Sequence, residues 1–262
     1  MTVLLLRRRD AGERKEYMRI NVHAGHNPAG KVACGAVGLI NESTENRRVK
    51  DEVISQLRQL GHTVYDCTVD NGTGQKDVLN RIVAKCNAHV VDLDVSIHFN
   101  AGAKDEKGNG KTTGVEVLIY RASDITRAIG KRVADAVAAL GYRLRSDQTS
   151  PEPGVKVNPK LAVLKNTKAP AMLIECCFVD DRDDVQMYDC RSMASAIVYG
   201  ITGQRVQVPA ETDKAEEGEE TPTGDRSALY RVQVGAYGVK SNAEAMKKKL
   251  QKAGFDALIV QA

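Results

Sequence analysis

Short apolar runs alternate with segments of helical periodicity between Met18 and about Gly203. Between residues 41 and 60, for example, apolar residues recur at helical spacing, and Gly61 marks the end of the segment. Further helices are expected at 75–87, 124–140 and 184–201, and strands at 19–22, 63–69, 90–99, 114–120, 161–164 and 171–178. Strands separated by helices predict an α/β fold, a three-layer sandwich with a mostly parallel central sheet and helices on both faces.

The pattern changes after residue 203. Residues 204–227 hold Pro209, Pro222 and a cluster of acidic residues with almost no large apolar side chain, which is typical of a linker. Strand, helix and strand patterns then follow at 230–237, 242–253 and 256–260, which predicts a small βαβ fragment. The expected organisation is an N-terminal extension (1–17), a main domain (18–203), an acidic linker (204–227) and a C-terminal module (228–262).

Composition narrows the function classes. Hydrophobic residues make up 42% of the 262 positions, enough for a core, and no apolar run reaches the roughly 18 to 20 residues of a membrane-spanning helix. Tryptophan is absent and phenylalanine occurs three times, which disfavours binding of single-stranded nucleic acid by base stacking. We therefore expect neither membrane insertion nor a nucleic-acid partner.

The net charge of +4 averages over two unlike parts of the chain. Seven acidic and two basic residues between 210 and 226 give that segment a charge of −5, which leaves +9 on the rest. A basic body of this kind favours an anionic partner surface.

The six cysteines lack the spacing of a zinc ribbon, which predicts reduced thiols in a protein made in the cytoplasm. The N-terminal apolar run is short and precedes its basic cluster, whereas a signal peptide has the basic residues first. We therefore expect no signal peptide.

Four polar residues stand where the pattern predicts strand ends, a helix start or core. His26 follows the first strand, Glu42 opens the first helix, and His98 ends the strand at 90–99. In α/β sheets, strand ends and the loops after them share the edge that binds ligands. Glu175 interrupts an apolar strand, where an ionised side chain is costly unless it is paired or lies beside a metal.

Each of these residues also has a simpler explanation. A histidine at a strand end is often a hydrogen-bonded structural residue, as we expect for His62 and His89. Glu42 suits the first turn of any helix, and Glu175 could be half of a buried ion pair. Taken together on one sheet edge, two histidines and a glutamate match a catalytic zinc site with an open fourth position.

Four ordered motifs resemble one known family, the zinc-dependent N-acetylmuramoyl-L-alanine amidases of bacterial autolysins and phage endolysins. The resemblance spans about Met18 to Gly203. It rests on Ala24-Gly-His26, on Gly38-Leu-Ile-Asn-Glu42 with Asn46, on Ser96-Ile-His98-Phe-Asn100-Ala101, and on Leu161-Ala-Val-Leu164 leading into Pro170-Ala-Met-Leu-Ile-Glu175-Cys-Cys-Phe178.

The resemblance implies that His26, Glu42 and His98 bind Zn²⁺ and that Glu175 is the catalytic glutamate. It also implies peptidoglycan as the substrate, cut between N-acetylmuramic acid and L-alanine. Many members carry Asp where this chain has His23, so His23 could compete as a ligand. The usual glycine after the catalytic glutamate is Cys176, which with Cys177 leaves a thiolate ligand open.

The C-terminal pattern at 230–253 resembles the first half of a sporulation-related (SPOR) repeat, a module that recognises peptidoglycan glycan strands. The alternative is a fragment without a binding role.

For the whole protein, we expect a monomeric, endolysin-like enzyme that acts on the bacterial cell wall after release on lysis. The alternatives are a non-catalytic peptidoglycan-binding protein, or a zinc peptidase or deacetylase on the same fold.

Overall fold

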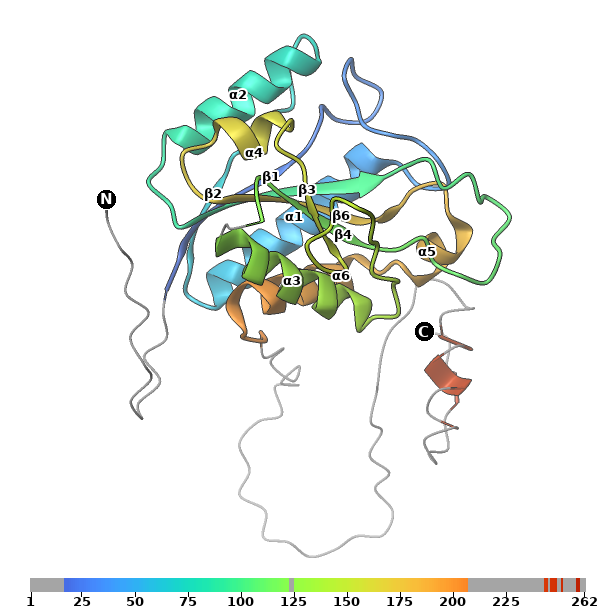
Figure 1. The fold of residues 1–262 in the computed structure, drawn as a ribbon. Helices are drawn as coiled ribbons and strands as arrows, with labels where there is room; N and C mark the ends of the chain where they lie inside the picture. The colour runs from blue at the N-terminus through green and yellow to red at the C-terminus, as the bar shows by residue number, and fades with distance from the viewer. Residues whose placement is uncertain are drawn as a thin grey trace, which may run out of the picture. The chain divides into compact units, whose positions relative to one another are not determined.

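The computed structural model describes residues 17–122 and 125–206, together with residues 243, 244, 246–248, 251, 258 and 259. The chain divides into two units, Met1–Val206 and Gln207–Ala262, and the elements labelled in Figure 1 belong to the first. The predicted extension lies outside the described residues except for Tyr17, the predicted strand at 230–237 lies outside them, and the strand at 256–260 lies mostly outside them. Within the predicted helix at 242–253, the described positions are helical.

Six strands and six helices make up the first unit as described. In chain order they are β1 (Arg19–Ala24), α1 (Glu42–Gln59), β2 (Thr63–Asp66), α2 (Gln75–Asn87), β3 (Leu93–Asn100), β4 (Glu116–Ile119), α3 (Ile125–Ala138), β5 (Val155–Val157), α4 (Ala162–Asn166), β6 (Ala171–Phe178), α5 (Arg182–Met187) and α6 (Cys190–Thr202). The strands form one sheet in the order β2-β1-β3-β6-β4-β5. All neighbouring pairs are parallel except β4 and β6, which confirms the mostly parallel sheet.

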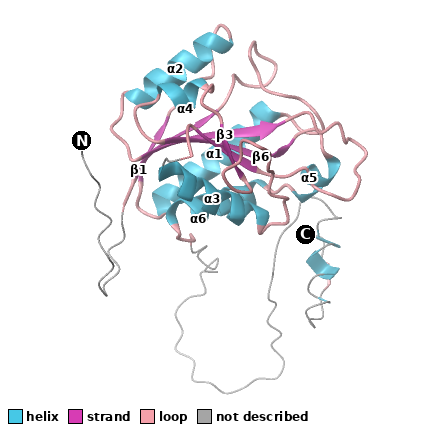
Figure 2. Ribbon diagram, viewed as in Figure 1, coloured by secondary structure: helices cyan, strands magenta, loops and turns pink. Residues whose placement is uncertain are grey.

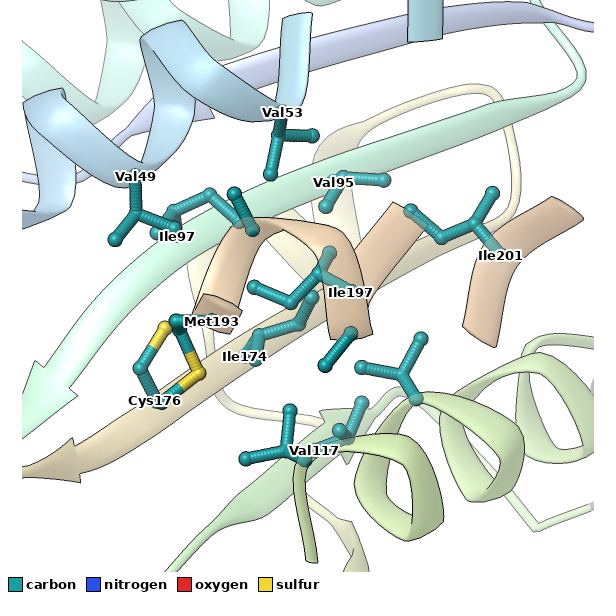
Figure 3. Packing of buried hydrophobic residues seen from close by; sticks show 14 of the residues in the cluster. Val49, Val53, Val95, Ile97, Val117, Ile174, Cys176, Met193, Ile197 and Ile201 are labelled. Carbon is teal, nitrogen blue, oxygen red and sulfur yellow. The ribbon is translucent and has the colours of Figure 1, made fainter. Parts of the chain in front are cut away.

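Helices cover both faces of the sheet, as predicted (Figure 2). One face packs against α1, α3 and α6 in the larger apolar cluster. Figure 3 shows Val95 and Ile97 of β3 among side chains from α1 and α6. The opposite face meets α2 and α4 in a smaller cluster. Full burial of each Val, Ile or Leu side chain contributes about 1.5 to 3 kcal/mol to folding, so the two clusters fix the sheet between its helices. No helix in the described part of the chain combines the length and the apolar character that a membrane crossing requires.

Three details differ from the sequence prediction. The run 161–164, predicted as a strand, lies at the start of helix α4, where Val163 and Leu164 are buried against the smaller cluster. The single helix predicted at 184–201 is two helices, because Tyr188 is extended and the Asp189 side chain caps α6 by accepting from Ser192 N. Strand β5 was not predicted, since three residues at a sheet edge are too short to show a period.

Candidate metal centre and active site

Strand alternation places a few polar side chains on the face of the sheet opposite the larger cluster. Ile97 and Ile174 point into the larger cluster, so their neighbours His98 and Glu175 lie on the opposite face. His98 pairs with Glu175 across β3 and β6, and Glu175 pairs with Glu116 across β6 and β4. Three ionisable side chains therefore form a row across the sheet, which we call the site row.

The three candidate metal ligands meet at one end of this row. His26 follows β1, Glu42 is the first residue of α1, and His98 lies near the end of β3. One ligand atom from each falls within 4.8 Å of the other two. Glu42 Oε1 lies 3.0 Å from His98 Nδ1 and 3.4 Å from His26 Nε2. Two imidazole nitrogens and one carboxylate oxygen are a donor set that can hold a transition-metal ion.

The backbone fixes the Glu42 carboxylate from two sides. Ala36 N donates to Oε2 at 2.8 Å, and Phe99 N donates to Oε1 at 3.2 Å. Burial alone would raise the pKa of Glu42, but hydrogen bonds from His26 and His98 outweigh it and hold that pKa well below its usual range. The Asn41 side chain, which caps α1 by accepting from Thr44 N, sets where the helix starts and hence where Glu42 stands.

Two glycines leave room for the ligands, and sequence reasoning did not single them out. A Cβ on Gly25 would lie 2.0 Å from His98 Cε1, and a Cβ on Gly35 would lie 2.4 Å from Glu42 Oε2. Neither separation is compatible with a side chain, so both ligands depend on glycine at these positions. The motif Ala24-Gly-His26 contained the signal for Gly25, because a glycine before a ligand often marks a close approach.

Glu175 is the neighbour of His98 in the site row. Its Oε2 atom is sealed from solvent and has no hydrogen-bond partner among the described residues. Burial raises the pKa of Glu175 well above its usual range, the nearby charges of Glu42 and Glu116 raise it further, and Arg145 opposes them. A carboxyl group of this kind is suited to take up and release a proton.

Glu116, at the other end of the site row, is fully engaged. It accepts from Asn100 Nδ2 and Arg145 Nε, each at 2.8 Å, and from Lys156 Nζ at 2.7 Å. Its side chain is 7% exposed, and its basic partners Arg145 and Lys156 lie within ion-pair distance. The pattern of the sequence had not pointed to this network, because its members come from four separate segments.

The residues that depart from the family pattern lie apart from the ligands. His23 is buried with Nδ1 3.4 Å from Ser96 Oγ, and burial lowers its pKa to about 3, so it is neutral. Cys176 points into the larger cluster near Met193 (Figure 3), and burial raises the pKa of the Cys176 and Cys177 thiols well above the usual range. Among the described residues, the group of possible ligands around Glu42 includes none of these three side chains.

A second group of carboxylates needs no metal ion to explain it. Asp105 of the loop after β3 approaches Asp181 and Asp183, which lie at the start of α5. Asp183 accepts from three successive backbone N–H groups, at 109–111, and Asp181 accepts from the backbone and hydroxyl of Thr113. These bonds anchor the loop after His98 to the start of α5.

Comparisons with known proteins agree with this arrangement. Residues 20–203 match the family model of N-acetylmuramoyl-L-alanine amidase, Amidase_3, and residues 218–262 match the model of the SPOR domain. The catalytic domain of the CD27L endolysin, which targets Clostridia Difficile, has the same fold, with a TM-score of 0.57 and 23% identity over 73% of this chain and 100% of that one.

Two curated relatives cover the amidase region. An uncharacterized protein of Clostridium perfringens is 34% identical over 175 residues, which are 65% of this chain and 47% of that protein. The N-acetylmuramoyl-L-alanine amidase CwlM of Bacillus licheniformis is 26% identical over 176 residues, 66% of this chain and 58% of that protein. The chain thus spans about half the length of the curated relatives it matches. Because the amidase model covers most of its length, the chain belongs to the N-acetylmuramoyl-L-alanine amidase family.

Proposed function

We propose that this protein is a zinc-dependent amidase that hydrolyses the bond between N-acetylmuramic acid and L-alanine in peptidoglycan. The observation that carries the proposal is the convergence of His26, Glu42 and His98, with Glu175 beside His98 on the next strand and its Oε2 buried without a hydrogen-bond partner among the described residues. Membership of the amidase family supports the substrate class. A peptidoglycan-binding protein without activity would not need all four side chains.

The residues present fit a zinc ion. Zinc prefers nitrogen and oxygen ligands of this kind, and catalytic zinc sites keep three protein ligands and one open position. His26, Glu42 and His98 would hold the ion. When bound, zinc lowers the pKa of a coordinated water toward about 7 and polarises the scissile carbonyl.

Glu175 supplies the proton chemistry. Its carboxylate accepts a proton from the attacking water and donates it to the nitrogen of the departing L-alanine, without which the amide bond re-forms. Burial and the charges of Glu42 and Glu116 raise the pKa of Glu175, so the protonated form is accessible at the second step. Glu116 cannot take this part because its oxygens already accept from Asn100, Arg145 and Lys156.

The domain organisation follows from the same proposal. Residues 18–203 form the catalytic domain, and the acidic segment 204–227 tethers it to a SPOR module at 228–262 that binds the glycan strands of the cell wall. The match of 218–262 to the SPOR model supports this assignment. We further propose that the enzyme acts on the cell wall as a monomer, without inserting into a membrane.

The substitution Glu175→Gln tests the proposed role directly. Glutamine keeps the shape but cannot exchange a proton, so zinc content should remain at wild-type level while release of soluble fragments from peptidoglycan falls at least about 100-fold. Glu106→Gln, at an exposed position in the loop after β3, is the matched control and should remain active. A Glu175→Gln enzyme with full activity would show that another group moves the proton.

A further inference from the structure

The backbone at His26 is unusual for a residue with a side chain. Its φ angle is 63°, in the left-handed region that favours glycine. This conformation turns the chain sharply after β1 and places His26 Nε2 3.4 Å from Glu42 Oε1. The preceding residue is Gly25, and a side chain there would collide with the His98 ring. A strained turn of this kind persists only where neighbouring groups hold it.

Arg47 of α1 is one of the groups that hold this turn. Its Nη2 donates to the carbonyl oxygen of His26 at 2.8 Å, and its Nη1 lies 3.3 Å from the carbonyl oxygen of Gly25. Asn46 Nδ2 donates to the same Gly25 oxygen at 3.1 Å. The two carbonyls that flank the strained φ angle are therefore both bound by side chains of one helix turn.

A carboxylate on the other side fixes the guanidinium. Asp70, in the loop between β2 and α2, accepts from Arg47 Nε at 3.0 Å and from Nη2 at 2.8 Å. Arg47 Nη2 also lies 3.3 Å from the carbonyl oxygen of Val69. One planar group with five donors thus joins α1, the turn after β1 and the loop after β2, and its side chain is only 17% exposed.

We propose that Arg47 is a positioning residue for the metal centre, which holds His26 in its left-handed conformation so that the imidazole meets Glu42 and His98. The inference rests on the proposed zinc site. Within the described part of the chain, Arg47 donates hydrogen bonds to the backbone of His26 and of Gly25 but to none of the three ligand side chains, so we infer that it acts through His26. Lysine cannot replace it, because one ammonium group cannot reach both carbonyls and Asp70 in the planar geometry of a guanidinium.

The test measures zinc affinity of the full chain by competition with a chromophoric chelator. Outer groups that orient metal ligands typically contribute about 10- to 100-fold in affinity, so Arg47→Met should bind zinc about 10- to 100-fold more weakly than wild type. Arg48→Met is the matched control: this neighbour is 61% exposed and pairs with Glu45, and its affinity should stay within about twofold. If Arg47→Met does not fold, Arg47→Lys is used with the same expectation.

A double-mutant cycle shows whether Arg47 acts through His26. In a His26→Ala background the ligand is gone, so adding Arg47→Met should change zinc affinity by less than about twofold. If Arg47→Met lowers zinc affinity as much in the His26→Ala background as in the wild-type background, Arg47 does not act through His26 and the proposal is overturned. Wild-type zinc affinity in the Arg47→Met single variant would also overturn it. Failure of the wild-type chain itself to bind zinc would instead refute the proposed metal site.

Discussion

Replacing Gly25 by alanine should disable the site through a single methyl group. The φ angle of Gly25 is outside the left-handed region, so alanine meets no backbone strain there. The added Cβ would, however, lie 2.0 Å from Cε1 and 2.1 Å from Nε2 of His98. Gly25 directly follows β1, and its backbone N–H donates to the carbonyl oxygen of Ile97 in β3 at 3.1 Å, so the His98 ring has to move rather than the backbone.

The geometry sets the size of the effect. An ordinary contact between carbon atoms is about 3.5 Å, so the ring must retreat by roughly 1.5 Å. That shift takes His98 Nδ1 out of its 3.0 Å contact with Glu42 Oε1. A misplacement of about 1 Å at a catalytic centre can lower the rate about 100-fold, which corresponds to about 2.7 kcal/mol in activation free energy.

The assay compares Gly25→Ala with wild type for zinc affinity and for the rate at which soluble fragments leave peptidoglycan. Both should fall, the rate by about 100-fold or more. Gly74→Ala is the control, because nothing lies within 4 Å of its added Cβ and its φ of 173° is extended backbone. A Gly25→Ala enzyme with wild-type zinc affinity and rate would refute the assignment of His98 as a ligand in this geometry.

Three further predictions concern stability. Zinc at 100 times its dissociation constant should raise the free energy of unfolding by about 2.7 kcal/mol, and His98→Ala should abolish this gain in a thermal-shift assay. Asn41→Ala removes the cap of α1 and should lower that free energy by about 1 kcal/mol in urea; no change would show that the cap is dispensable. Burial raises the pKa of Asp66, but hydrogen bonds from Lys50 and Thr68 outweigh it and lower that pKa below 3.8. The resulting stabilisation is present above pH 3.8 and lost as the pH falls through the lowered pKa. Asp66→Asn should therefore destabilise the protein slightly at pH 7, and the loss should shrink as the pH is lowered below 3.8; a loss that does not change with pH would contradict this.

The sequence predicted the long elements well, because each spans enough residues to show its period. Helices α1 and α2 begin and end within a residue of their predicted limits. The four apolar residues at 161–164 were too few to separate a period of 2 from one of 3.6, and they form part of a helix. The reversed direction of β4 left no local trace, since the alternation of a strand is the same in either direction.

The sequence could predict those site residues whose position depends only on the neighbouring strand or helix. His26, Glu42 and His98 were each placed by the element that precedes or contains them, and the structure brings the three together. The network around Glu116 and the contacts of Arg47 join segments far apart in the chain, and no local pattern records them. Such partners are found only once the strand order is known.

The most direct test of the central claim is to identify the new chemical ends after the zinc-loaded protein digests purified peptidoglycan. The account predicts new amino ends that belong to L-alanine alone, with intact glycan strands, and their loss when zinc is removed by a chelator. New reducing sugar ends, free acetate, or amino ends from another residue of the stem peptide would contradict it.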